Sequence, residues 1–134
     1  MNRCVVIADD DPTVVNLVKL RLGMDQYDVV ATNDAVAAIA MVRSRTPAAV
    51  ILDVQMPGGG GLSALAKIKA DPFLSGMPVM MLTGERNAET VMEAMGSGAD
   101  DYMVKPFNPD VLAQRVSRLV ERAAKVPAAT TWEI

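Results

Sequence analysis

The chain has 134 residues, of which 51% are hydrophobic, and its formal net charge is −3 with no dense basic block. This length suits one domain with its own core, while no apolar run reaches the roughly 18 residues of a membrane span and nothing favours direct nucleic-acid contact. One cysteine (Cys4), no histidine and no signal-peptide pattern at the start predict a cytoplasmic protein without an internal disulfide, His-based catalysis or histidine-ligated zinc.

The first predicted strand, residues 4–8, is followed directly by three aspartates, Asp9 to Asp11. Two carboxylates about 4 Å apart repel by about 4 kcal/mol at an effective dielectric near 20, so this crowding indicates either solvated side chains or a bound cation. Asp11 precedes Pro12, which suits a first helical turn, and is best explained as the cap of a helix over residues 12–23.

The rest of the chain repeats the pattern of an apolar run followed by a helix-like stretch. The further predicted strands are residues 28–31, 49–52, 79–82 and 102–104. The further predicted helices are about 33–45, capped by Asn33 or Asp34, then 62–70, 88–95 and a last one from 109 onward. Several strands are short continuous apolar blocks, typical of a parallel sheet covered on both faces. Five βα units in succession predict a doubly wound α/β fold with right-handed crossovers.

Polar residues with complementary chemistry follow the predicted strands. The three aspartates follow the first strand, Asp53 the third, Thr83 the fourth and Lys105 the fifth. Carboxyl ends of parallel strands meet at one rim of the sheet, where functional groups gather. An aspartate nucleophile, carboxylates for Mg²⁺, a hydroxyl and an ammonium are the set that phosphoryl transfer to a carboxylate requires.

Four separate stretches, "VVIADDDP", "VILDVQMPGGGGL", "VMMLTGE" and "GADDYMVKPF", resemble in order the signatures of the receiver domain of two-component response regulators. The resemblance covers about residues 3–124. It implies a flavodoxin-like, five-stranded parallel sheet of order 2-1-3-4-5 with helices on both faces. It assigns residues 1–125 to the receiver domain, and leaves 126–134 as a frayed end, a docked end or the start of a linker.

The resemblance also implies roles for individual residues. Asp53 is the phosphorylated aspartate. Mg²⁺, for which Mn²⁺ is the expected substitute, is held by Asp9, Asp10, Asp53 and the backbone carbonyl of Gln55. The other implied positions are the phosphate-contacting and switch residues Thr83, Gly84, Tyr102 and Lys105, the tuning residues Gln55 and Glu85, and Pro106 after a cis peptide bond.

By the same resemblance the chain is a signalling switch rather than an enzyme, catalysing only its own phosphorylation and dephosphorylation. Its expected donor is a histidine kinase or a histidine phosphotransfer protein. Its expected effector or output domain binds the face formed by the fourth helix, fifth strand and fifth helix, and dimerisation is left open. The main alternative is a Mg²⁺-dependent phosphohydrolase of the haloacid-dehalogenase type with Asp53 as nucleophile, although Gln55 stands where its second acid belongs. The second alternative is a module that binds a flavin or another nucleotide, although the three aspartates after the first strand would repel the phosphate of such a ligand.

Overall fold

The computed structural model describes residues 3–125, in which five strands alternate with five helices. The predicted tail, residues 126–134, lies outside the described residues. No helix of the described part is long and apolar enough to cross a membrane. The elements are β1 (Cys4–Ala8), α1 (Pro12–Gly23), β2 (Asp28–Thr32), α2 (Ala35–Arg45), β3 (Ala49–Leu52), α3 (Gly60–Ala70), β4 (Val79–Thr83), α4 (Ala88–Gly96), β5 (Asp101–Val104) and α5 (Pro109–Lys125).

The strands form one parallel sheet in the order β2-β1-β3-β4-β5, which confirms the predicted fold class. β1 lies between β2 and β3, with Val6 aligned to Val30 on one side and to Val50 on the other. The direction of the crossovers reverses between β1 and β3. In doubly wound sheets this reversal opens a crevice at the carboxyl ends of the two strands, so Asp9 and Asp53 are placed beside each other.

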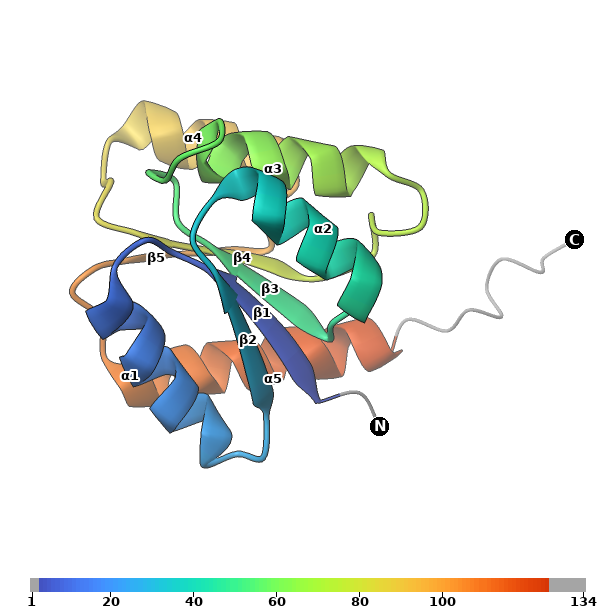
Figure 1. Cartoon of the computed structure of the whole chain (residues 1–134). Coiled ribbons are helices and arrows are strands. Elements are labelled where there is room, and N and C mark those ends of the chain that lie inside the picture. Colours follow the sequence, from blue (N-terminus) through green and yellow to red (C-terminus); the bar gives the residue numbers. More distant parts are fainter. Residues whose placement is uncertain (1–2, 126–134) are drawn as a thin grey trace, which may run out of the picture.

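Each face of the sheet is covered by helices (Figure 1): α1 and α5 lie on one face, and α2, α3 and α4 on the other. Two separate apolar clusters result. Ile7, Ile51 and Leu82 point toward α1 and α5, whereas Val6, Leu52 and Met81 point toward the other three helices. Alternate residues of the same strand therefore enter opposite cores. This explains why the strands read as continuous apolar blocks.

Four helices begin at a side chain that accepts a hydrogen bond from the first turn, and at α5 this side chain is Asn108, which accepts from the Asp110 N–H at 2.8 Å. Asp11 accepts from the Thr13 N–H at 2.9 Å and Asp34 from the Ala37 N–H at 2.7 Å, so the predicted Asp11 cap is confirmed and Asp34 is selected over Asn33. Asn87 caps α4 by accepting from the Glu89 N–H at 2.8 Å. Thr83 is the last residue of β4 and does not cap α4.

Candidate phosphoacceptor site

Buried polar side chains lie at the carboxyl ends of three adjoining strands. Asp9 follows β1, Asp53 follows β3 and Thr83 is the last residue of β4. Their exposed fractions are 3%, 5% and 0%, and no other polar or charged side chain between residues 3 and 125 is classed as buried. Burial of a charge is unfavourable unless it is paired. Two buried carboxylates at one rim therefore indicate a site organised around cations.

Lys105, directly after β5, supplies one of these cations. Its Nζ donates to Asp9 Oδ2 at 2.7 Å and to Asp53 Oδ2 at 3.1 Å. Its backbone N–H donates to the Thr83 carbonyl at 2.8 Å, which fixes where the lysine leaves the sheet. The peptide bond between Lys105 and Pro106 is cis. The ammonium therefore bridges two strand ends from a third.

The second oxygen of each buried carboxylate is held by the backbone of the loop that follows it. Asp9 Oδ1 accepts from the Asp11 N–H at 2.9 Å, and Asp53 Oδ1 accepts from the Gln55 N–H at 3.1 Å. Each carboxylate is thus fixed at both oxygens, one by an amide and one by Lys105. Such fixed orientation favours a reaction in which one carboxylate oxygen must face an incoming group.

The pKa values report how tightly the charges are packed. Burial lowers the pKa of Lys105, but its hydrogen bonds to Asp9 and Asp53 outweigh burial and raise that pKa above the ordinary value, so the ammonium stays charged. Burial raises the pKa of Asp9 despite the compensating hydrogen bond from Lys105. One lysine therefore does not fully offset the loss of hydration at this rim.

Asp9, Asp10 and Asp53 fit a divalent metal ion. One oxygen from each carboxylate lies within 4.8 Å of the others. Three carboxylates and one ammonium carry a formal charge of −3 + 1 = −2, which a single Mg²⁺ would neutralise. Asp10 is exposed, so it reaches the site from the solvent side, where waters complete a magnesium shell. The Gln55 carbonyl stays a predicted ligand.

Thr83, Glu85 and Tyr102 connect the rim to the loop after β4. The Glu85 N–H donates to Thr83 Oγ1 at 3.2 Å, and the Tyr102 hydroxyl donates to the Glu85 carbonyl at 2.6 Å. Burial, with the nearby charges of Glu85 and Asp53, raises the pKa of Tyr102. Gly84 is exposed, and a Cβ built on it would meet no atom within 4 Å. Space beside Thr83 is therefore open.

Gly61 is a positional requirement that the sequence analysis missed. A Cβ on Gly61 would lie 2.0 Å from the Asp53 carbonyl oxygen, so the start of α3 touches the backbone of the aspartate directly. Gly58, Gly59 and Gly60 have positive φ angles of 84°, 101° and 78°. These three glycines turn the chain into α3 two residues earlier than predicted. The run of four glycines at 58–61 was the feature of the sequence that could have predicted this close approach of two backbones.

A family model described as the response regulator receiver domain matches residues 5–117. The chain belongs to this family. The receiver is 34% identical over 128 residues to the DNA-binding response regulator MtrA of Mycolicibacterium smegmatis, in a match that covers 96% of this chain and 55% of MtrA. It therefore spans about half the length of the curated relatives it matches.

Solved structures of a response regulator and of a signal receiver domain have the same fold as this chain. A response regulator of Chloroflexus aurantiacus J-10-fl superposes with a TM-score of 0.85 at 30% identity, covering 91% of this chain and 100% of that chain. The signal receiver domain of a histidine kinase from Syntrophus aciditrophicus superposes with a TM-score of 0.84 at 28% identity, covering 93% and 95%. Neither these matches nor the family supports a phosphohydrolase of the haloacid-dehalogenase type or a nucleotide module.

Proposed function

We propose that the receiver accepts a phosphoryl group on Asp53 from the histidine of a kinase or phosphotransfer protein, and that this changes which partner it binds. The observation that carries the proposal is the Lys105 ammonium, which bridges the buried carboxylates of Asp53 and Asp9 at the carboxyl ends of the strands. The Asp53 carboxylate is held in one orientation, and it lies at the topological switch point of the sheet, where ligands bind in this class of fold.

In the proposed reaction an Asp53 carboxylate oxygen attacks phosphorus while the bond from phosphorus to the donor nitrogen breaks. The products are an acyl phosphate on Asp53 and a free imidazole on the donor. A bound Mg²⁺ would neutralise charge on the phosphoryl oxygens, held by Asp9, Asp10, Asp53 and the Gln55 carbonyl. Lys105 would move from the Asp53 oxygen onto a phosphoryl oxygen, and the Thr83 hydroxyl would donate to another.

Phosphorylation would then act through the loop after β4. If Thr83 turns its hydroxyl to the phosphoryl group, the Glu85 N–H loses its acceptor. A shift of Glu85 would then alter the hydrogen bond from the Tyr102 hydroxyl to the Glu85 carbonyl. The face formed by α4, β5 and α5 is the proposed binding surface for an effector, a following domain or a second copy. The modification shifts this face only as far as it stabilises one state over the other.

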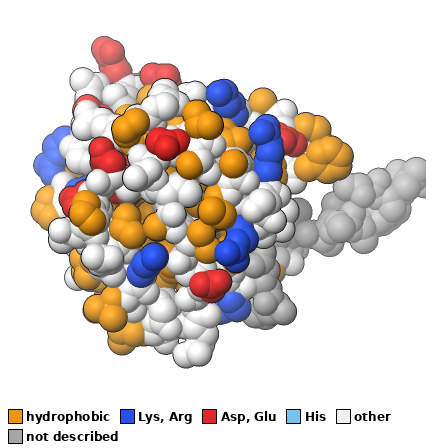
Figure 2. Space-filling view, viewed as in Figure 1, with side chains coloured by type: hydrophobic (Ala, Val, Ile, Leu, Met, Phe, Trp, Pro, Cys, Tyr) orange, Lys and Arg blue, Asp and Glu red, His pale blue; other side chains and the backbone are white. Residues whose placement is uncertain are grey.

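The same site would reverse the modification by hydrolysis. Gln55 and Glu85, two residues after Asp53 and Thr83, are the residues expected to tune this hydrolysis; Gln55 is exposed, and the half-buried Glu85 accepts from the Asn87 N–H at 2.9 Å through its carboxylate. We therefore propose self-phosphorylation and self-dephosphorylation as the only chemistry, with no separate substrate. Figure 2 shows acidic and basic side chains interspersed on the face in view, with no continuous patch of either sign. That face offers no charge footprint for nucleic acid.

The test is intact-mass measurement after mixing the protein with acetyl phosphate and, separately, with phosphoramidate. We expect one phosphoryl group per chain in the presence of Mg²⁺ or Mn²⁺, and none after chelation with EDTA. Uptake that is independent of the metal ion, or no uptake from either donor with Mg²⁺ present, would contradict the proposed chemistry.

Lys105→Met is expected to bind Mg²⁺ about tenfold more tightly than the wild type, which corresponds to about 1.4 kcal/mol. The substitution removes a positive charge that competes for Asp9 and Asp53 oxygens. The measurement is the increase in melting temperature as Mg²⁺ is added, which follows from mass action. Lys69→Met is the matched control, since it also removes a lysine–aspartate pair, to Asp100 at 3.1 Å, away from the site. An unchanged or weaker Mg²⁺ response of Lys105→Met would refute the charge argument.

Tyr102→Phe is expected to retain phosphoryl uptake but to loosen the loop after β4. It removes the donor of the 2.6 Å hydrogen bond to the Glu85 carbonyl, at a cost of about 1 kcal/mol. Amides of residues 84–88 should exchange with deuterium several-fold faster. Tyr27→Phe, at the only other tyrosine, should leave these amides unchanged. Equal exchange in both variants would show that the contact does not hold the loop.

A further inference from the structure

The two ends of α4 are held in different ways. Only Ala94 of its nine residues is buried, whereas Met92 and Met95 are exposed. Its first turn follows the loop after β4, in which the Glu85 carbonyl accepts from the Tyr102 hydroxyl. Because the helix buries so little of its own surface, its position depends chiefly on the contacts at its two ends.

The turn after α4 is fastened to the start of β4 by Asp100. The Asp100 N–H donates to the Val79 carbonyl at 2.8 Å, and the Val79 N–H donates to Asp100 Oδ2, also at 2.8 Å. Val79 is fully buried, so this carboxylate satisfies a backbone donor that water does not reach. Asp100 therefore joins the chain to β4 one residue before the register of β4 and β5 begins, at Met80 and Asp101.

Lys69, in the last turn of α3, holds this carboxylate and the loop before β4 together. Its Nζ donates to Asp100 Oδ2 at 3.1 Å, to the Met77 carbonyl at 2.8 Å and to the Ser75 carbonyl at 3.2 Å. An ammonium has three N–H donors, so all of them are used. The Lys69 side chain is 17% exposed, and a Cβ on Gly98 would lie 3.1 Å from its Cγ. The stem of the lysine thus passes directly over the turn after α4.

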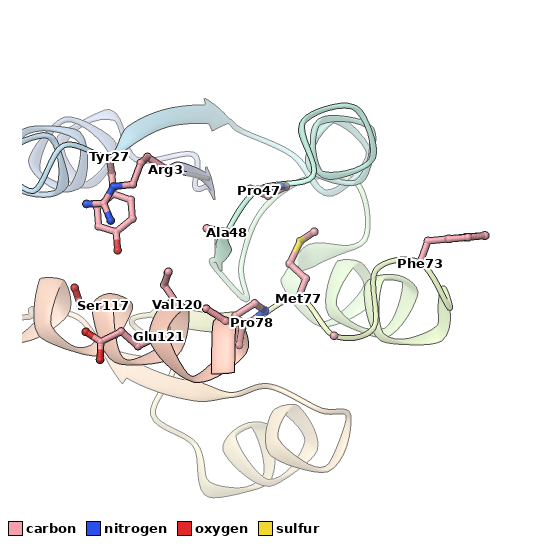
Figure 3. Close-up of a pocket in the computed structure, with 13 residues that line it drawn as sticks. Arg3, Tyr27, Pro47, Ala48, Phe73, Met77, Pro78, Ser117, Val120 and Glu121 are labelled. Atoms are coloured by element: carbon pink, nitrogen blue, oxygen red, sulfur yellow. The ribbon is translucent and has the colours of Figure 1, made fainter. Parts of the chain in front are cut away.

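The loop between α3 and β4 has a second attachment besides Lys69. Leu74 is buried in the apolar cluster between the sheet and the helices α2, α3 and α4. Figure 3 shows Met77 and Pro78 against a pocket at the amino ends of the strands, and the ring of Phe73 directed away from that pocket. Removing the Lys69 ammonium would therefore loosen this loop without detaching it, so a variant at this position can fold.

We propose that Lys69 and Asp100 form an anchor that fixes the carboxyl-terminal end of α4, and that α4 turns about this end when Asp53 is phosphorylated. This inference rests on the proposed function. A shift of the loop of residues 84–87 would carry the first turn of α4 with it, whereas the turn after α4 stays bound to β4 and α3. The displacement is therefore largest at the first turn of the helix and smallest at its last turn.

Hydrogen–deuterium exchange of the unphosphorylated protein tests the anchor by itself. Lys69→Met keeps a stem of similar length but removes the ammonium, so the amides of residues 75–80 and 97–101 should exchange several-fold faster than in the wild type. Lys67→Met is the matched control. Lys67 lies in the same turn of α3, is exposed and forms no salt bridge within the described residues, so its replacement should leave these amides unchanged.

Asp100→Asn is a second variant of the anchor. Asparagine can still accept from the Val79 N–H but lacks the charge that pairs with Lys69. The same amides should therefore exchange faster than in the wild type, by a smaller factor than in Lys69→Met. Far-ultraviolet circular dichroism checks that both variants fold. If neither variant exchanged faster than the wild type in these two segments, the anchor would be refuted.

Beryllofluoride with Mg²⁺, a stable mimic of the phosphoryl group, tests the turning of α4. In the wild type, exchange of residues 84–91 should change while that of residues 97–101 does not, and in Lys69→Met the change should extend to residues 97–101. Equal changes in both segments of the wild type, or no change in residues 84–91 with beryllofluoride bound, would overturn the proposal. Absence of bound beryllofluoride in the fluorine NMR spectrum would refute the proposed function and the turning of α4 with it, whereas the exchange of the unmodified variants would still decide the anchor.

Discussion

Asp53→Asn is expected to take up no phosphoryl group from acetyl phosphate under conditions in which the wild type is modified stoichiometrically. The amide lacks the nucleophilic oxygen anion and removes one charge from the proposed metal site. Lys105 keeps its 2.7 Å contact to Asp9, so the rim stays assembled. The readout is intact mass, compared at equal Mg²⁺ concentration.

The fold should tolerate this substitution. Asparagine keeps the shape of the side chain and can still accept from the Gln55 N–H, and losing one contact to Lys105 is offset by weaker repulsion from Asp9 and Asp10. We expect the free energy of unfolding to change by no more than about 1–2 kcal/mol. Asp28→Asn, at an exposed position at the start of β2, controls for loss of any carboxylate. Full labelling of Asp53→Asn would show that another residue is the acceptor.

The sequence predicted the fold nearly completely because local and global signals agree in this chain. The apolar blocks predict the strands, and the capping residues predict where the helices between them begin. Asp11 and Asp34 cap α1 and α2, and Pro12 is the first residue of α1. Element ends moved by one or two residues, as at β5, which begins at Asp101 rather than Tyr102. Such ends depend on hydrogen bonds to neighbouring strands, which a single sequence does not display.

The site was predictable as a set of residues but not as a set of contacts. Strand ends placed Asp9, Asp53, Thr83 and Lys105 on one rim. That Lys105 bridges two carboxylates while Asp10 remains exposed depends on side-chain directions set by the three-dimensional register. The hydroxyl of Tyr102 reaches a backbone carbonyl 17 residues earlier in the chain, and no spacing rule predicts it. Gly61 was missed because its role is to leave room for another backbone.

Gly61→Ala is expected to lower the free energy of unfolding by about 3 kcal/mol. A Cβ here would lie 2.0 Å from the Asp53 carbonyl oxygen and 2.7 Å from its carbon, and both are backbone atoms that no side-chain rotation can move away. Either α3 must move away from β3 or the backbone of Asp53 must move. Since Asp53 carries the proposed chemistry, phosphoryl uptake should slow together with the loss of stability.

Gly23→Ala is the matched control and should have the opposite sign. Gly23 ends α1, and a Cβ there meets no atom within 4 Å. Alanine at such a position restricts the unfolded chain and stabilises by about 0.4–1 kcal/mol. Urea unfolding of both variants separates the close approach at Gly61 from the general effect of replacing glycine. If Gly61→Ala proved as stable as the wild type, α3 could retreat from Asp53 freely, and the backbone contact would not be what positions the acceptor.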